Sequence, residues 1–91
     1  MADNEQKRYY VYVLKSENHY RFYVGMTDNV ERRVKEHNSG KTKSTKGYLP
    51  WSLLFYEECP SRMEARAREK YLKSGIGKEW IKQQWSGSSA G

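Results

Sequence analysis

The stretch from Tyr9 to Asn38, YYVYVLKSENHYRFYVGMTDNVERRVKEHN, decides how the chain folds. It begins with β-branched and aromatic residues over 9–14, continues through a polar segment over 16–19, and returns to an extended pattern over 22–25. Two such runs joined by a polar connection of this length predict a β-hairpin. Both faces of the first run are apolar or aromatic. We therefore expect its strand to be covered on both sides and to lie centrally in a small sheet.

A helix is predicted after the hairpin. Four residues share the i, i+3, i+4, i+7 spacing of one helix face: Val30, Arg33, Val34 and His37. Nothing but the two valines can face a core, so Arg33 and His37 stand unexpectedly on the apolar stripe. Either Arg33 extends past the core into solvent with His37 at the edge of the stripe, or the stripe opens onto a cleft that both residues line.

Capping signals mark the starts of two helices. Asp28 with Glu31 forms a candidate capping box for the first, or at least gives it an acidic first turn. Ser61 with Glu64 forms the corresponding box for a second helix, which we expect to run to about Lys73.

The rest of the pattern completes a small domain. Alternating residues predict a third strand over 50–58, and a last short helix is predicted over 77–85. We expect a frayed N-terminus over 1–7, one domain over 8–85 and a disordered Ser/Gly-rich tail over 86–91. The predicted fold is α+β (α/β): a three-stranded antiparallel sheet flanked by helices, in the order β-β-α-β-α-α.

The second helix repeats the anomaly of the first. Ala65, Arg68, Glu69 and Leu72 follow the spacing of one face, so Glu69 lies on an apolar stripe. Either Glu69 pairs with an arginine at the edge of the core, or its carboxylate faces the same cleft as Arg33. Two helices that each place a charge on their apolar stripe favour the cleft.

Composition favours a nucleic-acid partner. The 91 residues hold 17 Lys+Arg against 11 Asp+Glu, a net charge of +6, together with 8 Tyr and 3 Trp. Basic charge neutralises phosphates, and aromatic rings stack on bases. A single cysteine, Cys59, excludes an internal disulfide and a cysteine-based zinc site. The absence of a long apolar run predicts a soluble, cytoplasmic protein that does not enter a membrane.

The segment over 39–47 is short, basic and rich in hydroxyl groups, which predicts a flexible loop. Because it follows the helix that carries Arg33 and His37, we expect Lys41, Lys43 and Lys46 to contact nucleic-acid phosphates. The simpler alternative is a solvated loop without a partner.

An ordered series of motifs resembles the GIY-YIG nuclease domain. The series is Tyr10-Val11-Tyr12, Tyr23-Val24-Gly25, Arg33, His37, Pro60-Ser61, Glu64-Ala65 and Arg68-Glu69-Lys70. The first motif keeps only the tyrosine of the family pattern, and the second has valine for isoleucine. The match runs from about Tyr9 to Lys73. It is similar to small stand-alone bacterial members, which are themselves similar to the N-terminal domain of the bacterial excinuclease.

This resemblance implies a metal-dependent endonuclease that hydrolyses phosphodiester bonds of DNA. Glu69 would hold one divalent cation, Mg²⁺ or another such as Mn²⁺, and Arg33 would clamp the scissile phosphate. Tyr12 would act as general base, Tyr23 would position water or phosphate, and His37 would assist Tyr12. An ordinary tyrosine has a pKa of about 10, and we expect Arg33, the cation and nearby lysines to favour its phenolate.

The implied partner is single-stranded, branched or damaged DNA, in a repair context, bound by a monomer without a protein partner. A nucleic-acid-binding module with little or no cleavage activity is the alternative function. It would carry the same charge and aromatic content, but it would not need the complete set of five site residues. An adaptor that docks on a protein is a third class, disfavoured by the basic loop.

The register of the hairpin stays open at this stage. Pairing Lys15 with Arg21 would place Tyr12 opposite Val24, whereas pairing Lys15 with Tyr20 would place Tyr12 opposite Tyr23. The implied chemistry favours the second register. It predicts that all five site residues line one concave surface, with both tyrosines on the same face of the sheet.

Overall fold

The computed structural model describes residues 8–90, with side chains as far as Gln84. Its elements are β1 (Tyr9–Ser16), β2 (Phe22–Thr27), α1 (Val30–Asn38), the short 3₁₀ turn η2 (Lys46–Tyr48), β3 (Trp51–Cys59), α2 (Arg62–Lys73) and α3 (Gly75–Ala90). The predicted fold class and element order are confirmed.

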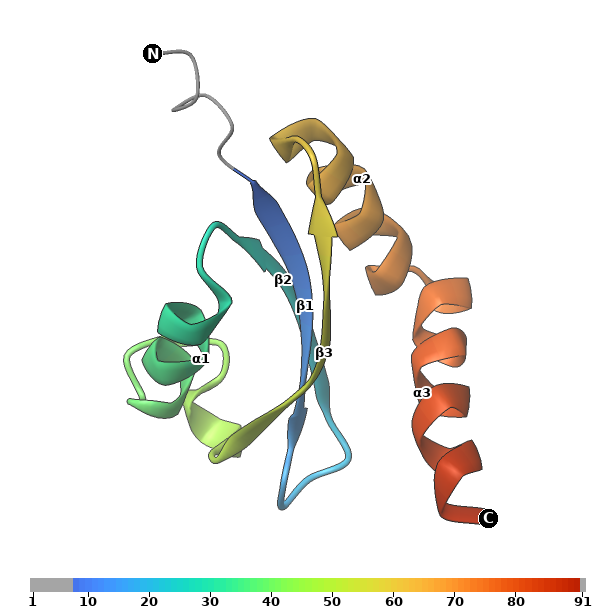
Figure 1. Cartoon of the computed structure of the whole chain (residues 1–91). Coiled ribbons are helices and arrows are strands. Elements are labelled where there is room, and N and C mark those ends of the chain that lie inside the picture. The colour runs from blue at the N-terminus through green and yellow to red at the C-terminus, as the bar shows by residue number, and fades with distance from the viewer. Residues whose placement is uncertain (1–7, 91) are drawn as a thin grey trace.

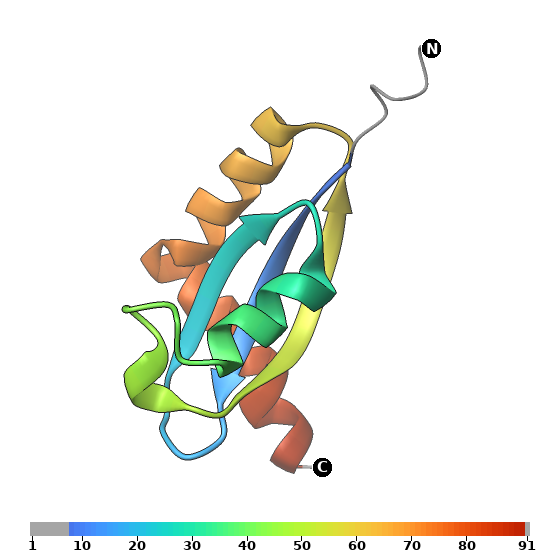
Figure 2. The ribbon, with the colours of Figure 1, turned by 90° about the vertical axis from the view of Figure 1, so that its left-hand side faces the viewer.

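The three strands form one antiparallel sheet in the order β2-β1-β3. Strand β1 is therefore central, as its two apolar faces predicted. Helix α1 covers one face of the sheet, and α2 and α3 lie against the opposite face (Figure 1). In the view turned by 90°, α1 lies in front of the sheet and the two C-terminal helices lie behind it (Figure 2). The sheet thus separates two small cores.

The two cores use alternate residues of β1. On the α1 side Tyr12, Leu14 and Trp51 are buried. On the other side the buried residues are Val11, Val13, Val24, Cys59, Ala65, Leu72 and Ile81. Burying one aliphatic side chain of this size contributes about 1.5–3 kcal/mol to folding. Each face of the strand therefore contributes to stability, and neither is free to slip.

The hairpin register differs from both alternatives considered above. Tyr12 pairs with Gly25, and Leu14 pairs with Tyr23, one residue beyond the second alternative. Ser16 sets this register: its backbone N–H donates to the Arg21 carbonyl at 3.0 Å, and its hydroxyl accepts from the backbone N–H of His19 at 3.1 Å. Tyr12 and Tyr23 are then diagonal neighbours on one face, with ring centroids 6.1 Å apart.

Strand β3 contains an irregularity that the sequence pattern did not predict. Val13 pairs with Phe55 while Leu14 pairs with Leu53, so Leu54 is an extra residue. Simple alternation would have placed Leu53 and Phe55 on one face. Instead Phe55 packs on the α3 side, with its ring 5.8 Å from that of Trp80, while Leu53 lies on the α1 side.

One of the two predicted caps is correct. Ser61 caps α2, accepting from the backbone N–H of Glu64 at 3.2 Å. Helix α1 is capped by Asn29, whose side chain accepts from the N–H of Arg32 at 3.0 Å. The predicted cap Asp28 lies one residue too early and instead forms an ion pair with Arg32 at 3.0 Å.

The last helix is longer than predicted. Helix α3 extends over Gly75–Ala90, so its backbone includes most of the segment predicted as a disordered tail over 86–91. Once a helix is nucleated, each added residue gains a hydrogen bond, and no proline interrupts this segment. The predicted frayed segment 1–7 lies outside the described residues. Within the described part of the chain, no helix combines the length and apolar character needed to span a membrane.

Candidate active site

A cavity of about 570 Å³ lies beside the edge strand β2. It is lined from β1, β2, the start of α1 and α2 by Tyr9, Tyr12, Tyr23, Gly25, Met26, Thr27, Asp28, Arg32, Arg33, Arg62, Arg66 and Glu69. We call it the arginine cavity, because four arginines face two carboxylates across it. Four of the five residues predicted for the site converge on this cavity: Tyr12, Tyr23, Arg33 and Glu69.

Tyr12 forms the floor of the arginine cavity. Its side chain is almost completely buried, and its hydroxyl lies 2.9 Å from Nε2 of His37. Burial raises the pKa of Tyr12 to about 12, and the opposing effect of Arg33 is smaller. The expectation that neighbouring positive charge would favour the phenolate is therefore wrong for the protein alone, in which desolvation dominates.

His37 does not line the arginine cavity. It is fully buried behind Tyr12, and its ring lies 4.7 Å from that of Tyr23, centroid to centroid. The predicted concave surface of five residues therefore holds four of them. The last turn of α1 directs the imidazole into the sheet, where both ring nitrogens have hydrogen-bond partners. Burial lowers the pKa of His37 to about 4, so the imidazole is neutral at pH 7.

Thr45 assigns the tautomer of His37. The Thr45 hydroxyl donates to the Thr42 carbonyl at 3.3 Å and lies 3.0 Å from Nδ1 of His37. Because the hydroxyl has one hydrogen, it accepts from His37, which places the imidazole hydrogen on Nδ1. Nε2 is then the acceptor for the hydroxyl of Tyr12. The result is a directed chain of hydrogen bonds, from Tyr12 through His37 and Thr45 to the backbone.

Thr45 was missed in the sequence because it lies in the segment predicted to be a flexible loop. In the structure Thr45 is buried, and its carbonyl accepts from the indole N–H of Trp51 at 2.9 Å. The loop is thus anchored at its centre. The lysines predicted to contact phosphates, Lys41, Lys43 and Lys46, are exposed and do not line the arginine cavity.

Arg33 faces the cavity and is held by its own helix. Its guanidinium lies 2.6 Å from the carboxylate of Glu36, and 29% of its side chain is exposed. The ion pair raises the pKa of Arg33 and lowers that of Glu36. Of the two alternatives for the stripe on α1, the cleft is correct for Arg33 and incorrect for the buried His37.

Glu69 projects from α2 into the same cavity. Only 15% of its side chain is exposed, and its carboxylate lies 2.9 Å from Nζ of Lys73 and 3.9 Å from the Arg66 guanidinium. The arginine of the core edge, Arg68, binds Glu57 of β3 instead, through two hydrogen bonds of 2.7 and 3.1 Å. Glu69 is therefore both ion-paired and directed at the cleft.

Three arginines of the cavity were not predicted as site residues: Arg32, Arg62 and Arg66. A signal for two of them exists in the sequence. Arg62, Arg66, Glu69 and Lys73 follow an i, i+4, i+7, i+11 spacing and so share one face of α2. Once Glu69 is assigned to a cleft, this spacing places both arginines beside it.

The donor set of the cavity fits a weakly held hard cation. No group of three or more His, Cys, Asp or Glu side chains within the described residues could enclose a metal ion. Mg²⁺ does not require such an enclosure, since it keeps several waters and often binds through one or two carboxylates plus substrate phosphates. Glu69 and the Tyr12 and Tyr23 hydroxyls are oxygen donors of the suitable kind.

Edge strand, tyrosines, helix-borne arginine and glutamate together define a GIY-YIG-type domain. The family model of the GIY-YIG catalytic domain matches residues 8–83. The chain belongs to the GIY-YIG family, whose domains are generally nucleases that act on nucleic acid with a divalent metal.

Within this family the chain is similar to small stand-alone proteins named UPF0213. It is 42% identical to the UPF0213 protein of Clostridium perfringens over 65 residues, which cover 70% of this chain and 69% of that protein. Against Bacillus subtilis YazA the identity is 37%, over 76% of this chain and 70% of YazA. The solution NMR structure of the UPF0213 protein BH0048 of Bacillus halodurans superposes with a TM-score of 0.52 at 36% identity, covering 86% and 85% of the two chains.

Proposed function

We propose that this protein is a metal-dependent endonuclease that hydrolyses phosphodiester bonds of DNA in the arginine cavity. One observation carries the proposal. Tyr12, Tyr23, Arg33 and Glu69 come from four different elements and still line one cavity. A structural role alone does not require two phenols, a guanidinium and a carboxylate to share one opening.

Each side chain has a role that suits its place. Arg33 binds the non-bridging oxygens of the scissile phosphate, where its planar fork neutralises charge as the transition state forms. Arg62 and Arg66 hold the neighbouring phosphates. Glu69 holds Mg²⁺ or a similar cation, which supplies further charge relief to the phosphoryl oxygens and the leaving oxygen. Tyr23, beside Tyr12 on the same face, positions the attacking water.

Tyr12 acts as general base through the hydrogen bond to His37. As water gives a proton to the phenol oxygen, Tyr12 passes its own proton to Nε2 of His37 along the 2.9 Å contact. A free phenolate is then never required, which matters because burial raises the pKa of Tyr12 to about 12. Negative charge developing on the phosphate favours the imidazolium that results.

A nucleic-acid-binding module with little or no cleavage activity is the second candidate. Two observations favour it: burial keeps the Tyr12 phenol protonated, and Glu69 is already paired with Lys73 at 2.9 Å. Both conditions oppose the chemistry, and bound substrate and cation have to overcome them.

A cleavage assay separates the two candidates. End-labelled single-stranded, duplex and branched DNA are incubated with the full chain in Mg²⁺ and, as a control, in EDTA. The nuclease predicts Mg²⁺-dependent products that Glu69→Gln abolishes while DNA binding persists, since glutamine keeps the shape and loses the charge. Glu64→Gln, at an exposed site on the same helix, is the matched control and should cleave normally. Binding without products in every condition supports the module instead.

A further inference from the structure

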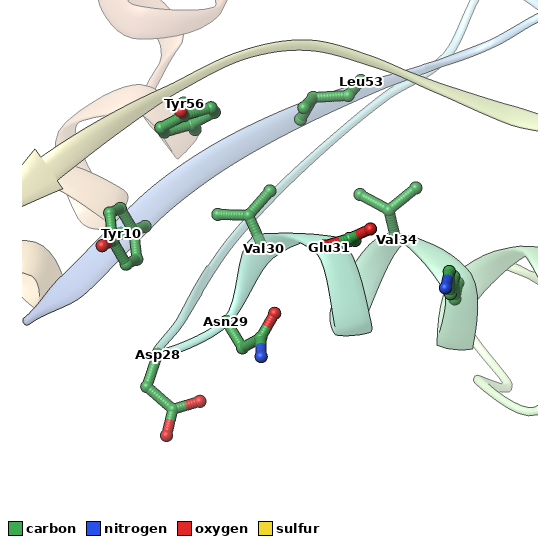
Figure 3. Close-up of a pocket in the computed structure, with 9 residues that line it drawn as sticks. Tyr10, Asp28, Asn29, Val30, Glu31, Val34, Leu53 and Tyr56 are labelled. Carbon is green, nitrogen blue, oxygen red and sulfur yellow. The ribbon is translucent and has the colours of Figure 1, made fainter.

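A second cavity, of about 650 Å³, opens on the other side of α1. Its walls are mainly apolar and aromatic: Tyr10, Val30, Val34, Leu53 and Tyr56. We call it the tyrosine groove. In Figure 3, Val30 and Val34 point from α1 toward Leu53 and Tyr56 of the sheet, and Tyr10 closes one end. The helix thus leaves part of its own apolar stripe uncovered.

The groove presents aromatic surface to solvent. The Tyr56 side chain is 54% exposed, and its ring meets that of Tyr10 edge to face, with centroids 5.8 Å apart. Tyr10 is half-buried and supports Tyr56 from below. An exposed ring held by a second ring is a rigid platform of the kind on which nucleobases stack.

The tyrosine groove is continuous with the arginine cavity. Asp28, at the start of α1, lines both. Across the sheet, Gly25, Tyr12 and Tyr56 form one row, because Tyr12 pairs with Gly25 on one side and with Tyr56 on the other. Two strand spacings amount to about 10 Å. A ligand that occupies the arginine cavity is therefore near enough to place a neighbouring group in the groove.

Charge divides the two cavities by ligand chemistry. The arginine cavity has four arginines against Asp28 and Glu69, so it favours phosphates. The charged groups of the tyrosine groove are Asp28, Glu31 and Lys35, which do not favour a dianion or a run of phosphates. A neutral, flat and largely apolar group suits the groove, and carboxylates at its mouth can accept hydrogen bonds from exocyclic amino groups.

We propose that the tyrosine groove binds one unstacked nucleobase of the substrate, next to the phosphate held in the arginine cavity, by stacking on Tyr56. The inference rests on the proposed function and deepens it. A base paired within a duplex cannot leave its stack without cost, so the groove selects single-stranded or locally opened DNA.

Binding measurements with abasic DNA test the groove directly. The protein carries Glu69→Gln to suppress cleavage, and the probe is a fluorescein-labelled single-stranded 12-mer in Mg²⁺, read by anisotropy. Tyr56→Ala should weaken binding by about tenfold, consistent with stacking worth ~1–3 kcal/mol per base. Tyr56→Trp, which keeps a stacking surface, should bind like the parent. Tyr71→Ala removes another exposed tyrosine, on α2, and should leave affinity unchanged.

A single abasic residue is then moved along the 12-mer. At one position the abasic probe should bind the parent about tenfold more weakly, and there Tyr56→Ala should cause no additional loss. Equal binding by Tyr56→Ala and the parent to intact DNA would overturn the groove while leaving the proposed function intact. It would leave the groove to a different ligand, such as a strand of a protein added to the edge of β3. If the parent binds no DNA at all, the proposed function itself fails.

Discussion

Tyr12 and Gly25 lie directly opposite each other in the β1–β2 pairing, and the phenol of Tyr12 extends across Gly25. A Cβ atom at position 25 would come within 2.6 Å of the Tyr12 hydroxyl and 2.8 Å of its ring carbon Cζ. Tyr12 cannot retreat, because His37 lies behind it at 2.9 Å. The glycine of the Tyr-x-Gly motif is therefore required by the position of the proposed base.

Gly25→Ala should consequently lower both stability and cleavage. Overpacking of this kind costs about 1–3 kcal/mol, and the displaced phenol would lose its hydrogen bond to His37. Thermal unfolding and the cleavage rate measure the two effects. Gly47→Ala is the matched control, since a Cβ there meets nothing within 4 Å. An alanine variant at position 25 with unchanged melting temperature and turnover would show that Tyr12 is not held as described.

Thr45 should control the tautomer of His37 without contacting DNA. Thr45→Val keeps the shape and removes the acceptor of the Nδ1–H, leaving a buried donor unpaired at a cost of about 1–3 kcal/mol. Thr45→Ser keeps the hydroxyl. We expect the valine variant to lose stability and cleavage and the serine variant to recover both.

The ¹⁵N chemical shifts of His37 give a readout that simple destabilisation would not change. In the wild type and Thr45→Ser, they should report a hydrogen on Nδ1 and an unprotonated Nε2. In Thr45→Val they should report a mixture of tautomers or the opposite one. Identical shifts in all three proteins would mean that Thr45 does not direct the imidazole.

His37 should make folding stability depend on pH in the acid range. Burial lowers its pKa to about 4 in the folded protein, against about 6.5 in the unfolded chain. Between these values the unfolded chain binds the proton and the folded protein does not. Stability is therefore complete above pH 6.5 and falls as the pH drops toward 4, by about 3 kcal/mol.

Chemical denaturation at pH 7 and pH 4 measures this loss, and His37→Gln separates it from the titration of carboxylates. Glutamine does not titrate, so the variant should lose about 3 kcal/mol less than the wild type over the same interval. His19, the other histidine, serves as the control position, and His19→Gln should retain the full acid dependence. Parallel pH profiles for the wild type and His37→Gln would contradict the buried, neutral imidazole.

The sequence predicts most of the architecture because its signals are local. The faces of the first strand and the helix stripes with Arg33 and Glu69 are periodic patterns, and periodicity reports which face meets a core. The hairpin register was beyond reach, because it is decided by Ser16 bonds to the turn and by room for Tyr12 over Gly25. The extra residue Leu54 in β3 was likewise invisible, since apolar neighbours suit either face.

The site was predictable only where a residue broke its own pattern. Arg33 and Glu69 stand out because charge on an apolar stripe is anomalous, and both do face the arginine cavity. Thr45 breaks no pattern, because a threonine in a polar loop is ordinary; only its burial and its contact with His37 mark it. The exposed lysines of the same loop were the more conspicuous signal, and they lie outside the cavity.

Arginines of the cavity and lysines of the loop should affect DNA in different ways. Arg62→Gln with Arg66→Gln removes two charges beside Glu69, where phosphates next to the scissile bond are expected. For single-stranded DNA each lost contact lowers the slope of log K against log salt by about 0.7. The double variant should therefore flatten the slope by about 1.4 and also slow cleavage at saturating DNA, because phosphate positioning is lost.

Changing Lys41, Lys43 and Lys46 together to alanine should flatten the slope by up to about 2.1 and leave the saturated cleavage rate unchanged, since these residues lie outside the cavity. Lys78→Gln with Lys82→Gln, on α3, removes the same charge as the arginine pair and controls for net charge alone. Anisotropy titrations between 50 and 200 mM salt, at roughly physiological conditions, supply the slopes. If all three variants lose affinity in proportion to charge and cleave equally at saturation, the arginines act only through the overall field. A changed affinity with the arginine pair alone would make the lysine loop a bystander.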